Sequence, residues 1–373
     1  MPLCGEVAAA LRPVRVMVVD DSAVVRGLVS RWITAEQGLV LAGTAPNGRV
    51  ALDLVDTVAP DILLLDLDMP VLDGVAALPL LLRRRPGLSV VVVSTLTRRN
   101  AEISLRCLTL GALDYLPKPS GPRDLTASAA FRDELVGKLH GLSARHRVGR
   151  PGSAPAASPA WRPPRLRPRA AVPARAVLIG ASTGGPRAVI QVLRSLAPAA
   201  HEMPILVVQH MPPIFTSVFA AQIAAETGLA AAEARDGERV VAGRVFVAPG
   251  GRHMGLRSDG ASVVVRLDDG PALHHCRPSV DVLLNEAAEV YGAAAMAVIL
   301  TGMGTDGLDG ARRLAALGAA IVAQDEASSV VWGMPGAVAK AGLARQVLPL
   351  GEIAGAIEAR FATPGGSWTR AVA

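Results

Sequence analysis

The sequence predicts an α/β protein with two doubly wound parallel-sheet domains joined by a Pro/Arg-rich linker. Its 373 residues are roughly two to three times the usual size of one domain, so a single core is not expected. Short β-branched and aliphatic runs alternate with helical stretches on both sides of the linker, as in βα units. The linker is rich in proline, which disfavours helix interiors and central strands.

In the first block, residues 13–133, three continuous apolar runs predict strands buried on both faces of a parallel sheet. They cover residues 14–20, 61–66 and 88–94. Each run ends in an acidic or hydroxyl residue, and ligands of open α/β sheets bind beyond the carboxyl ends of the strands. The residues expected at that edge are Asp20, Asp21, Asp66 and Ser94.

Residues 134–174 are expected to form a flexible linker, because residues 141–175 contain seven prolines and little aliphatic periodicity. The positive charge is local to this region. Residues 121–175 hold 11 Lys and Arg against 3 Asp and Glu, whereas 1–120 hold 12 against 12 and 176–373 hold 15 against 17. We interpret the segment as a solvated tether, with a docking strip for an acidic partner as the alternative. A nucleic-acid partner is not expected.

Other features narrow the class of protein. No apolar run approaches the roughly 18 residues of a membrane helix, and the N-terminal segment lacks the pattern of a signal peptide. We therefore expect a cytoplasmic protein that is not membrane-embedded. Cys4, Cys107 and Cys276 are far apart and in no CxxC spacing, so neither a disulfide framework nor a zinc site is indicated.

The carboxylates of Asp20, Asp21 and Asp66 predict a magnesium site, because like charges at neighbouring strand ends repel unless a hard cation neutralises them. Asp21 and Asp66 would ligate the metal, with Asp20 acting through water and the backbone carbonyl of Asp68 adding an oxygen. Asp66 would then be a nucleophile. The alternative is that Asp21 or Ser22 merely caps the following helix.

Lys118 in the segment LPKP is placed to contact a phosphoryl oxygen as a point charge. Taken with DD after the first strand, DMPVLDG after Asp66 and ST at Ser94, residues 13 to about 120 resemble a response-regulator receiver domain. The resemblance implies phosphorylation by a histidine kinase. It assigns Asp66 as phosphoacceptor, Asp20 and Asp21 as the acid pocket, Ser94 as the switch hydroxyl, Lys118 as the phosphate lysine and Tyr115 as the rotating aromatic residue. Asp68 stands where the family usually has Glu.

The second block repeats the strand pattern. Runs at 175–180, 203–210, 295–302 and 319–325 predict buried strands, and residues 240–251 and 261–270 predict shorter strands of an antiparallel insertion or edge. The expected domain is residues 175–362, with an N-terminal extension at 1–12 and a C-terminal tail at 363–373.

Ser182 lies between a predicted strand and an amphipathic helix, in a segment that matches G-x-S-x-G from Gly180 to Gly184. The glycines of that motif let the chain turn sharply and expose the hydroxyl above the sheet. Backbone N–H groups at the start of the helix favour an oxyanion. The alternative is a Gly-rich turn that binds a nucleotide phosphate, although the full dinucleotide fingerprint is absent.

A serine hydroxyl needs a base, and His210 is the best-placed histidine because it ends the buried run ILVVQH. His274 and His275 beside Cys276 suggest a metal, but consecutive residues on a strand point to opposite faces, so zinc is not favoured there. For the orienting acid, Asp306 and Asp325 both follow predicted strands, and the pattern alone leaves them equal.

The segments IGASTGG, QHMPPIFTSVFA, VAPGGRHMGL, RPSVDVLL, TGMGTDG and QDEASSVVWGMPGAV resemble the catalytic domain of the chemotaxis methylesterase family, CheB, over residues 175 to about 350. This resemblance implies Ser182 as nucleophile, His210 as base, Asp306 as the triad carboxylate and the Met303 backbone N–H as oxyanion donor. Asp325 is then structural.

The two resemblances imply phosphorylation-regulated hydrolysis of glutamyl methyl esters on methyl-accepting chemoreceptors, with a companion glutaminase activity. Mg²⁺ would serve receiver phosphorylation only, and the esterase step would need no cofactor. Two other functions stay open: a receiver-controlled esterase for another protein or a small-molecule ester, and a non-catalytic module that binds a partner.

Overall fold

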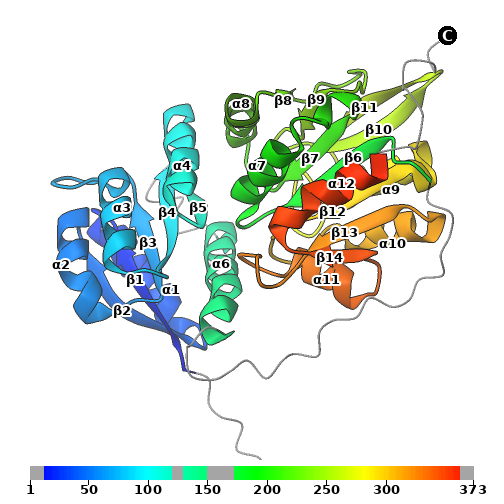
Figure 1. The fold of residues 1–373 in the computed structure, drawn as a ribbon. Helices are drawn as coiled ribbons and strands as arrows, with labels where there is room; N and C mark the ends of the chain where they lie inside the picture. The colour runs from blue at the N-terminus through cyan, green and yellow to red at the C-terminus, as the bar shows by residue number, and fades with distance from the viewer. Residues whose placement is uncertain (1–11, 120–128, 149–171, 362–373) are drawn as a thin grey trace, which may run out of the picture. The chain divides into compact units, whose positions relative to one another are not determined.

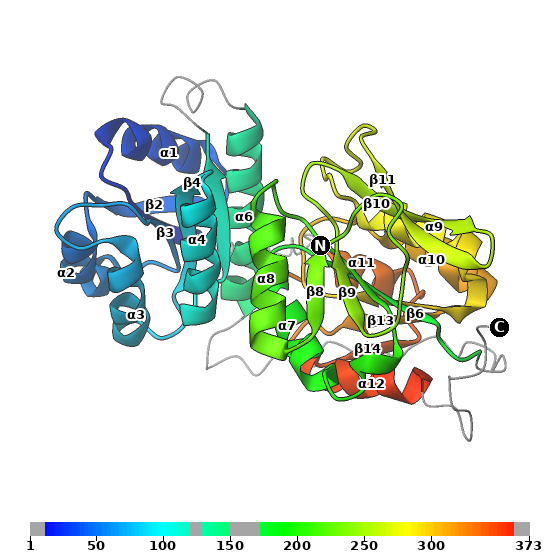
Figure 2. The ribbon, with the colours of Figure 1, turned by 90° about the horizontal axis from the view of Figure 1, so that it is seen from above.

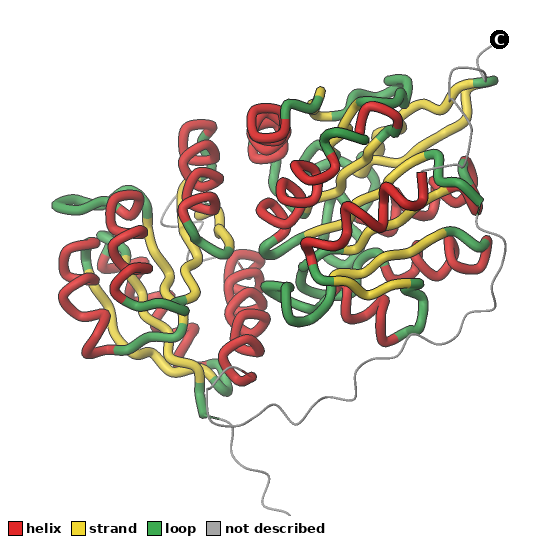
Figure 3. Tube along the Cα trace, in the orientation of Figure 1, coloured by secondary structure: helices red, strands yellow, loops and turns green. Residues whose placement is uncertain are grey.

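The computed structural model describes residues 12–119, 129–148 and 172–361, and the chain divides into two compact parts. In each part, strands lie between helices on both faces (Figures 1 and 3). The expected N-terminal extension, apart from Arg12, and the expected C-terminal tail lie outside the described residues.

The N-terminal part contains a five-stranded sheet of order β2-β1-β3-β4-β5 in which every pairing is parallel. Every residue of β3 is buried, which explains why its sequence reads as a continuous apolar run. The strands are β1 (Val14–Val19), β2 (Leu39–Ala45), β3 (Ile62–Asp66), β4 (Ser89–Thr95) and β5 (Asp114–Lys118).

Helices cover both faces of this sheet, with α1 on one side and α2 and α3 on the other (Figure 2). Helix α6 contacts α1, β1 and β5. The helices described within residues 12–148 are α1 (Ala23–Ala35), α2 (Gly48–Val58), α3 (Gly74–Arg84), α4 (Arg98–Leu110) and α6 (Ala129–Val148).

The start of the expected linker is helical, so that prediction was wrong for residues 134–148, which belong to α6. Leu135, Leu139 and Leu142 recur at helical spacing and are all buried, and this apolar stripe gives the helix a face to pack. The prolines that indicated a linker begin only at Pro151. Residues 149–171 of that linker lie outside the described residues.

The C-terminal part contains a seven-stranded sheet of order β14-β13-β12-β6-β7-β9-β8, again with parallel pairings throughout. Strand β6 is central, with β12 on one side and β7 on the other. The strands are β6 (Ala176–Ala181), β7 (Ile205–Gln209), β8 (Ala230–Glu233), β9 (Arg244–Val247), β12 (Ala295–Ile299), β13 (Ala320–Gln324) and β14 (Gln346–Leu348).

Helices α7, α8 and α12 pack together on one face of this sheet, and α9, α10 and α11 lie on the other (Figure 2). Helix α7 buries Val189, Val192, Leu193 and Leu196, which recur at helical spacing as expected for the amphipathic helix predicted after Ser182. The bounds are α7 (Gly185–Leu196), α8 (Phe215–Thr227), α9 (Val280–Val290), α10 (Leu308–Leu317), α11 (Met334–Lys340) and α12 (Ile353–Phe361).

The expected antiparallel insertion is a hairpin of β10 (His253–Asp259) and β11 (Ser262–Asp268). The shorter strand expected within 240–251 is β9, which pairs in parallel with β7 and β8 in the main sheet, so the expectation of an antiparallel insertion or edge was wrong for this strand. Its residues Val245, Phe246 and Val247 are buried, as expected for a strand that lies between β7 and β8.

Candidate active sites

The N-terminal sheet brings the predicted acid pocket together at the carboxyl ends of its strands. Asp20 follows β1, Asp66 ends β3, and Lys118 ends β5. The Lys118 Nζ lies 2.6 Å from Oδ2 of Asp20 and 2.8 Å from Oδ2 of Asp66. Carboxylate oxygens of Asp20, Asp21 and Asp66 lie within 4.8 Å of one another. This set of hard oxygen donors fits Mg²⁺.

Helix capping does not account for these aspartates. The cap of α1 is Ser22, whose Oγ accepts a hydrogen bond from the N–H of Val25. Asp20 accepts from the N–H of Ser22 through Oδ1 at 2.9 Å and directs Oδ2 to Lys118. The Asp21 side chain is exposed at the same edge.

Asp66 is electrostatically unusual. Burial, together with the nearby charge of Asp20, raises the pKa of Asp66 to about 6 in spite of the opposing Lys118 ammonium group. The two carboxylates in turn raise the pKa of Lys118, although burial alone would lower it. The pocket therefore holds more negative than positive charge, which favours a bound cation.

The other predicted receiver residues lie close to this edge or beneath it. Ser94 is buried near the end of β4, and Asp68 is exposed two residues after Asp66. Tyr115 is buried on β5, with the Lys138 Nζ 5.7 Å from its ring centroid. Lys138 forms a buried ion pair with Asp114, a pairing that the sequence analysis missed because the helix that carries Lys138 was interpreted as linker.

In the C-terminal part, three neighbouring strands bring Ser182, His210 and Asp306 to one edge. Ser182 follows β6, and His210 follows β7, whose last residue Gln209 is in register with Ala181. The His210 N–H donates to the Ala181 carbonyl at 3.1 Å. Asp306 lies in the loop after β12, on the opposite side of β6. His210 Nε2 is 2.7 Å from Oδ2 of Asp306.

The turn at Ser182 is fixed by its backbone. Its N–H donates to the Thr301 carbonyl at 3.0 Å, and its own carbonyl accepts from the Gly185 N–H and from Nε2 of Gln209. Gly184 has φ 76°, and a Cβ there would meet the Val330 side chain at 2.6 Å. The second glycine of the motif is thus required both by its left-handed backbone and by a close approach.

Asp306 is held mainly by groups at the start of α9, with one further N–H from Gly307 at the start of α10. Its Oδ1 accepts from the Ser279 hydroxyl at 2.7 Å and from the N–H groups of Asp281 and Gly307 at 3.0 Å, and its Oδ2 accepts from the Val280 N–H at 2.7 Å. Burial would raise the pKa of Asp306, but its hydrogen bonds, chiefly the one from His210, hold it at about 2. The carboxylate is therefore ionised.

The imidazole of His210 is contacted on both sides. Since a carboxylate only accepts, Nε2 carries a proton toward Asp306, and Nδ1 is the basic nitrogen of the neutral ring. Burial alone would lower the pKa of His210, but hydrogen bonds with Asp306 and with Cys276 raise it to about 10. The Cys276 Sγ is 3.4 Å from Nδ1.

The competing carboxylate is separate from this cluster. Asp325 accepts hydrogen bonds from the N–H and hydroxyl of Ser328 and so closes its own turn after β13. His253 is also structural, because its Nδ1 accepts from the Ser279 N–H and its Nε2 donates to the Pro271 carbonyl. The Met303 N–H donates to no other group within the part of the chain that the structure describes.

Two contacts at this edge were missed by sequence reasoning. Ser279 lies in the segment RPSVDVLL, but nothing in that pattern indicates a bond to Asp306, 27 residues away. A metal site at His274, His275 and Cys276 was not favoured, because consecutive residues of a strand point to opposite faces. In the structure His274 and His275 are not in a strand: they have φ 50° and 62° in a tight turn. The adjacency of two histidines and a cysteine was the signal that could have indicated Cys276.

A parallel sheet with an acidic pocket, followed by an α/β domain with Ser, His and Asp side by side at one sheet edge, is the arrangement of a hydrolase linked to a response-regulator receiver domain. The family model for CheB methylesterase matches residues 177–357, and that for the response regulator receiver domain matches residues 16–130.

Curated relatives agree along nearly the whole chain. A protein-glutamate methylesterase/protein-glutamine glutaminase of Nitrobacter hamburgensis is 47% identical over 94% of both chains. One of Bradyrhizobium diazoefficiens is 44% identical over 94% of both chains, and one of Caulobacter vibrioides is 47% identical over 93% of this chain and 98% of its own. The chain belongs to the CheB methylesterase family, and it is a hydrolase with a receiver domain.

Proposed function

We propose that this protein hydrolyses glutamyl methyl esters on methyl-accepting chemotaxis receptors, and deamidates specific glutamines, under control of phosphorylation at Asp66. The observation that carries the hydrolase assignment is the His210–Asp306 contact of 2.7 Å at the edge where Ser182 leaves β6. The names of the relatives support the substrate class.

In the ester reaction, Ser182 Oγ attacks the carbonyl carbon of the glutamyl ester while Nδ1 of His210 takes the hydroxyl proton. The Met303 N–H donates to the developing oxyanion. The C–O bond to the methoxy group breaks, and His210 returns the proton so that methanol leaves. Water then attacks the acyl-serine with His210 as base, releasing glutamate and restoring Ser182. A glutamine side chain would follow the same steps and lose ammonia.

Asp306 acts through His210. Its ionised carboxylate stabilises the imidazolium that forms in each step. Because the carboxylate binds Nε2, it also orients the ring so that Nδ1 points away from Asp306. The five hydrogen bonds that it accepts prevent the carboxylate from turning. No step of the esterase reaction is assigned to a metal.

In the receiver, the Asp66 carboxylate would attack the phosphoryl group donated by a histidine kinase. Mg²⁺, when bound, would neutralise charge on the transferring group, held by Asp20, Asp21, Asp66 and the Asp68 carbonyl. Lys118 is poised to bind a phosphoryl oxygen because its Nζ already lies 2.8 Å from Asp66. Ser94 would bind a second phosphoryl oxygen, and the Tyr115 side chain would rotate when Asp66 is phosphorylated.

Regulation would follow if the unphosphorylated receiver restricts access to the hydrolase edge and phosphorylation weakens that restriction, a two-state shift. No helix among the described residues is long and apolar enough to cross a membrane. We place the reaction in the cytoplasm, on the cytoplasmic domains of the receptors.

An alkyl phosphonate that acylates activated serines tests the hydrolase assignment. Mass spectrometry of the digested protein should place one adduct on Ser182, and Ser182→Ala should abolish it. His210→Gln should slow labelling strongly, because the base is lost. Stoichiometric labelling at another serine, or none at Ser182, would refute the assignment.

A further inference from the structure

A tight turn places a thiol against the catalytic base. Leu273 and Cys276 pair through two backbone hydrogen bonds of 3.1 and 2.7 Å, with His274 and His275 in left-handed conformations between them. This turn directs the half-buried Cys276 side chain to Nδ1 of His210, 3.4 Å away. Nδ1 is the nitrogen that the proposed mechanism uses.

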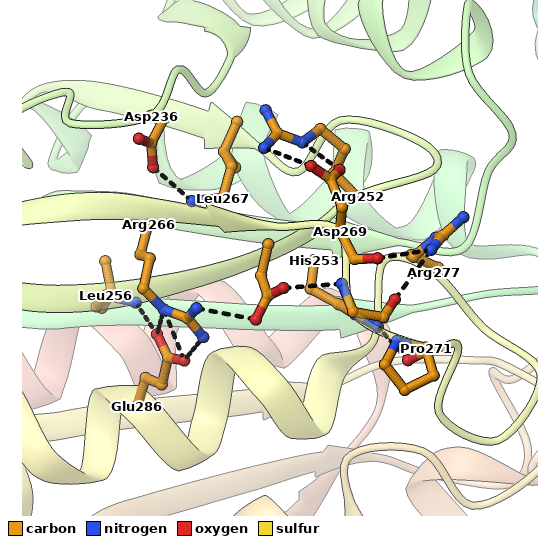
Figure 4. Close-up of polar contacts among 12 residues, drawn as sticks. Asp236, Arg252, His253, Leu256, Arg266, Leu267, Asp269, Pro271, Arg277 and Glu286 are labelled. Atoms are coloured by element: carbon orange, nitrogen blue, oxygen red, sulfur yellow. Dashed lines mark hydrogen bonds and ion pairs between the residues drawn. The ribbon is translucent and has the colours of Figure 1, made fainter.

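Polar contacts hold the chain in place on both sides of this turn (Figure 4). Arg252 binds the Asp269 carboxylate at 2.7 and 3.1 Å, and Arg277 donates to the carbonyls of Asp269 and Gly270. His253 binds the Pro271 carbonyl at 3.0 Å. The position of the thiol is therefore set by the fold of the β10–β11 hairpin.

The 3.4 Å distance between Cys276 Sγ and His210 Nδ1 matches the separation of two ligand atoms bound to one metal ion. Zinc binds thiolate at about 2.3 Å and imidazole at about 2.0 Å, so two such ligands at a tetrahedral angle lie about 3.5 Å apart. Histidines that bind a metal usually donate their other N–H to a carboxylate. His210 does so already, because its Nε2 lies 2.7 Å from Asp306.

The surroundings favour a cation. Ligand atoms of His210, Cys276 and Asp306 lie within 4.8 Å of one another, and so do those of His274, Asp281 and Asp306. Asp281 is 3% exposed, and its Oδ2 accepts no hydrogen bond from any described residue. That oxygen lies 3.2 Å from Nε2 of His274, the residue two positions before Cys276. Asp281 therefore adds a buried carboxylate oxygen beside the cluster, although burial raises the pKa of Asp281 and so disfavours its ionised form.

We infer that Cys276 and His210 form a binding site for a thiophilic divalent cation, Zn²⁺, and that occupancy of this site inhibits the hydrolase. Zn²⁺ on Nδ1 would occupy the lone pair that must accept the Ser182 proton. A thiolate and an imidazole select Zn²⁺ over Mg²⁺, so this site is chemically distinct from the acid pocket of the receiver. Water or the Ser182 hydroxyl would complete the coordination.

Binding can be tested without activity. Titration of the full chain with Co²⁺ should produce a thiolate-to-cobalt charge-transfer band that saturates at one equivalent, and Zn²⁺ should displace it. Cys276→Ser should abolish the band. His275→Asn, a matched variant in the same turn that tolerates the left-handed backbone, should keep it. No band, or a band that persists in Cys276→Ser, would overturn the inference.

Inhibition is tested by ester hydrolysis with increasing Zn²⁺, followed by addition of a chelator. Activity should fall and return, and Cys276→Ser should need at least about tenfold more Zn²⁺ for half inhibition. Equal inhibition of both proteins would overturn the inhibitory role and indicate zinc elsewhere, such as the receiver carboxylates. The inhibitory role rests on the proposed function, whereas the cobalt titration decides the site even if the chain does not hydrolyse esters.

Discussion

At the scale of single residues, His210 is distinguished by partners on both ring nitrogens. Asp306 binds Nε2 and Cys276 lies at Nδ1, and together they raise the pKa of His210 to about 10 against the effect of burial. A base must be unprotonated to act. In metal-free enzyme, kcat/KM should therefore rise with pH across the neutral range toward that pKa.

Cys276→Ala should move the rise of kcat/KM with pH to lower pH values, because the variant removes one of the two contacts that favour the protonated His210 ring. The measurement is kcat/KM against pH for both proteins with a chelator present, supported by NMR titration of the His210 ring. His275→Asn should keep the parent profile. A rise that does not move in Cys276→Ala would show that the thiol has no electrostatic influence on the base.

Ser279 is a positioning residue for Asp306. Removing a hydrogen bond to a buried charged group costs roughly 1.5–3 kcal/mol, and the Ser279 hydroxyl donates to Asp306 at 2.7 Å. Ser279→Ala should lower kcat at least about tenfold with little change in KM. It should also raise the pKa of Asp306, since one bond to the ionised form is lost. An unchanged kcat would contradict this role.

At the scale of secondary-structure elements, the joint between β6 and α7 depends on Gly184. Gly184 and Gly228 have similar backbones, φ 76° and 74°, but a Cβ at Gly228 would meet nothing within 4 Å. Gly228→Ala should lower the free energy of unfolding by about 1–2 kcal/mol, the cost of a left-handed side chain. Gly184→Ala should lower the free energy of unfolding by about 1–3 kcal/mol more, because its methyl group would overpack against Val330, and should reduce esterase activity. If urea unfolding gave the two variants the same loss of unfolding free energy, the close approach to Val330 would be contradicted.

The receiver sheet should show the raised pKa of Asp66 in its stability. Folding raises this pKa to about 6, so the folded state binds the proton more tightly than the unfolded chain. Without metal, the free energy of unfolding contributed by Asp66 should fall as pH rises from about 4 to 6. Mg²⁺ binds the ionised form and should restore about 1.4 kcal/mol at ten times its Kd near pH 7.5.

Thermal unfolding with and without Mg²⁺ at pH 4.5 and 7.5 measures this effect. Mg²⁺ should raise the Tm of the receiver transition at pH 7.5 and leave it unchanged at pH 4.5. Asp66→Asn should lose most of the response at pH 7.5. An equal Mg²⁺ response at both pH values would mean that the ion does not bind Asp66.

At the scale of the whole molecule, the features predicted from sequence are those that depend on local pattern. Continuous apolar runs gave both parallel sheets, because strands buried on both faces need no polar side. The residues that follow these strands, such as Asp66, Ser182 and His210, were predicted because parallel strands end at a common edge. The 2.7 Å contact between His210 and Asp306 favours Asp306 over Asp325, which the pattern alone left equal, and the catalytic role of Asp306 stays a prediction.

What could not be predicted depends on chain geometry over long sequence distances. Ser279 reaches Asp306 only because α9 starts beside the loop after β12. Cys276 reaches His210 because two left-handed residues reverse the chain, a conformation that non-glycine residues seldom adopt. The start of the expected linker was not predicted as part of helix α6, because the proline-rich composition of the segment after it dominated the interpretation. The helical spacing of Leu135, Leu139 and Leu142 could have indicated it.

The most direct test of the account is methanol release from a fully methylated receptor fragment, measured with and without a small phosphodonor plus Mg²⁺. Release should require Ser182, rise with the phosphodonor, and lose that rise in Asp66→Asn. Ser182→Ala should reduce release by roughly 10⁴- to 10⁶-fold. Release that persists in Ser182→Ala, or no release from the parent chain, would contradict the account.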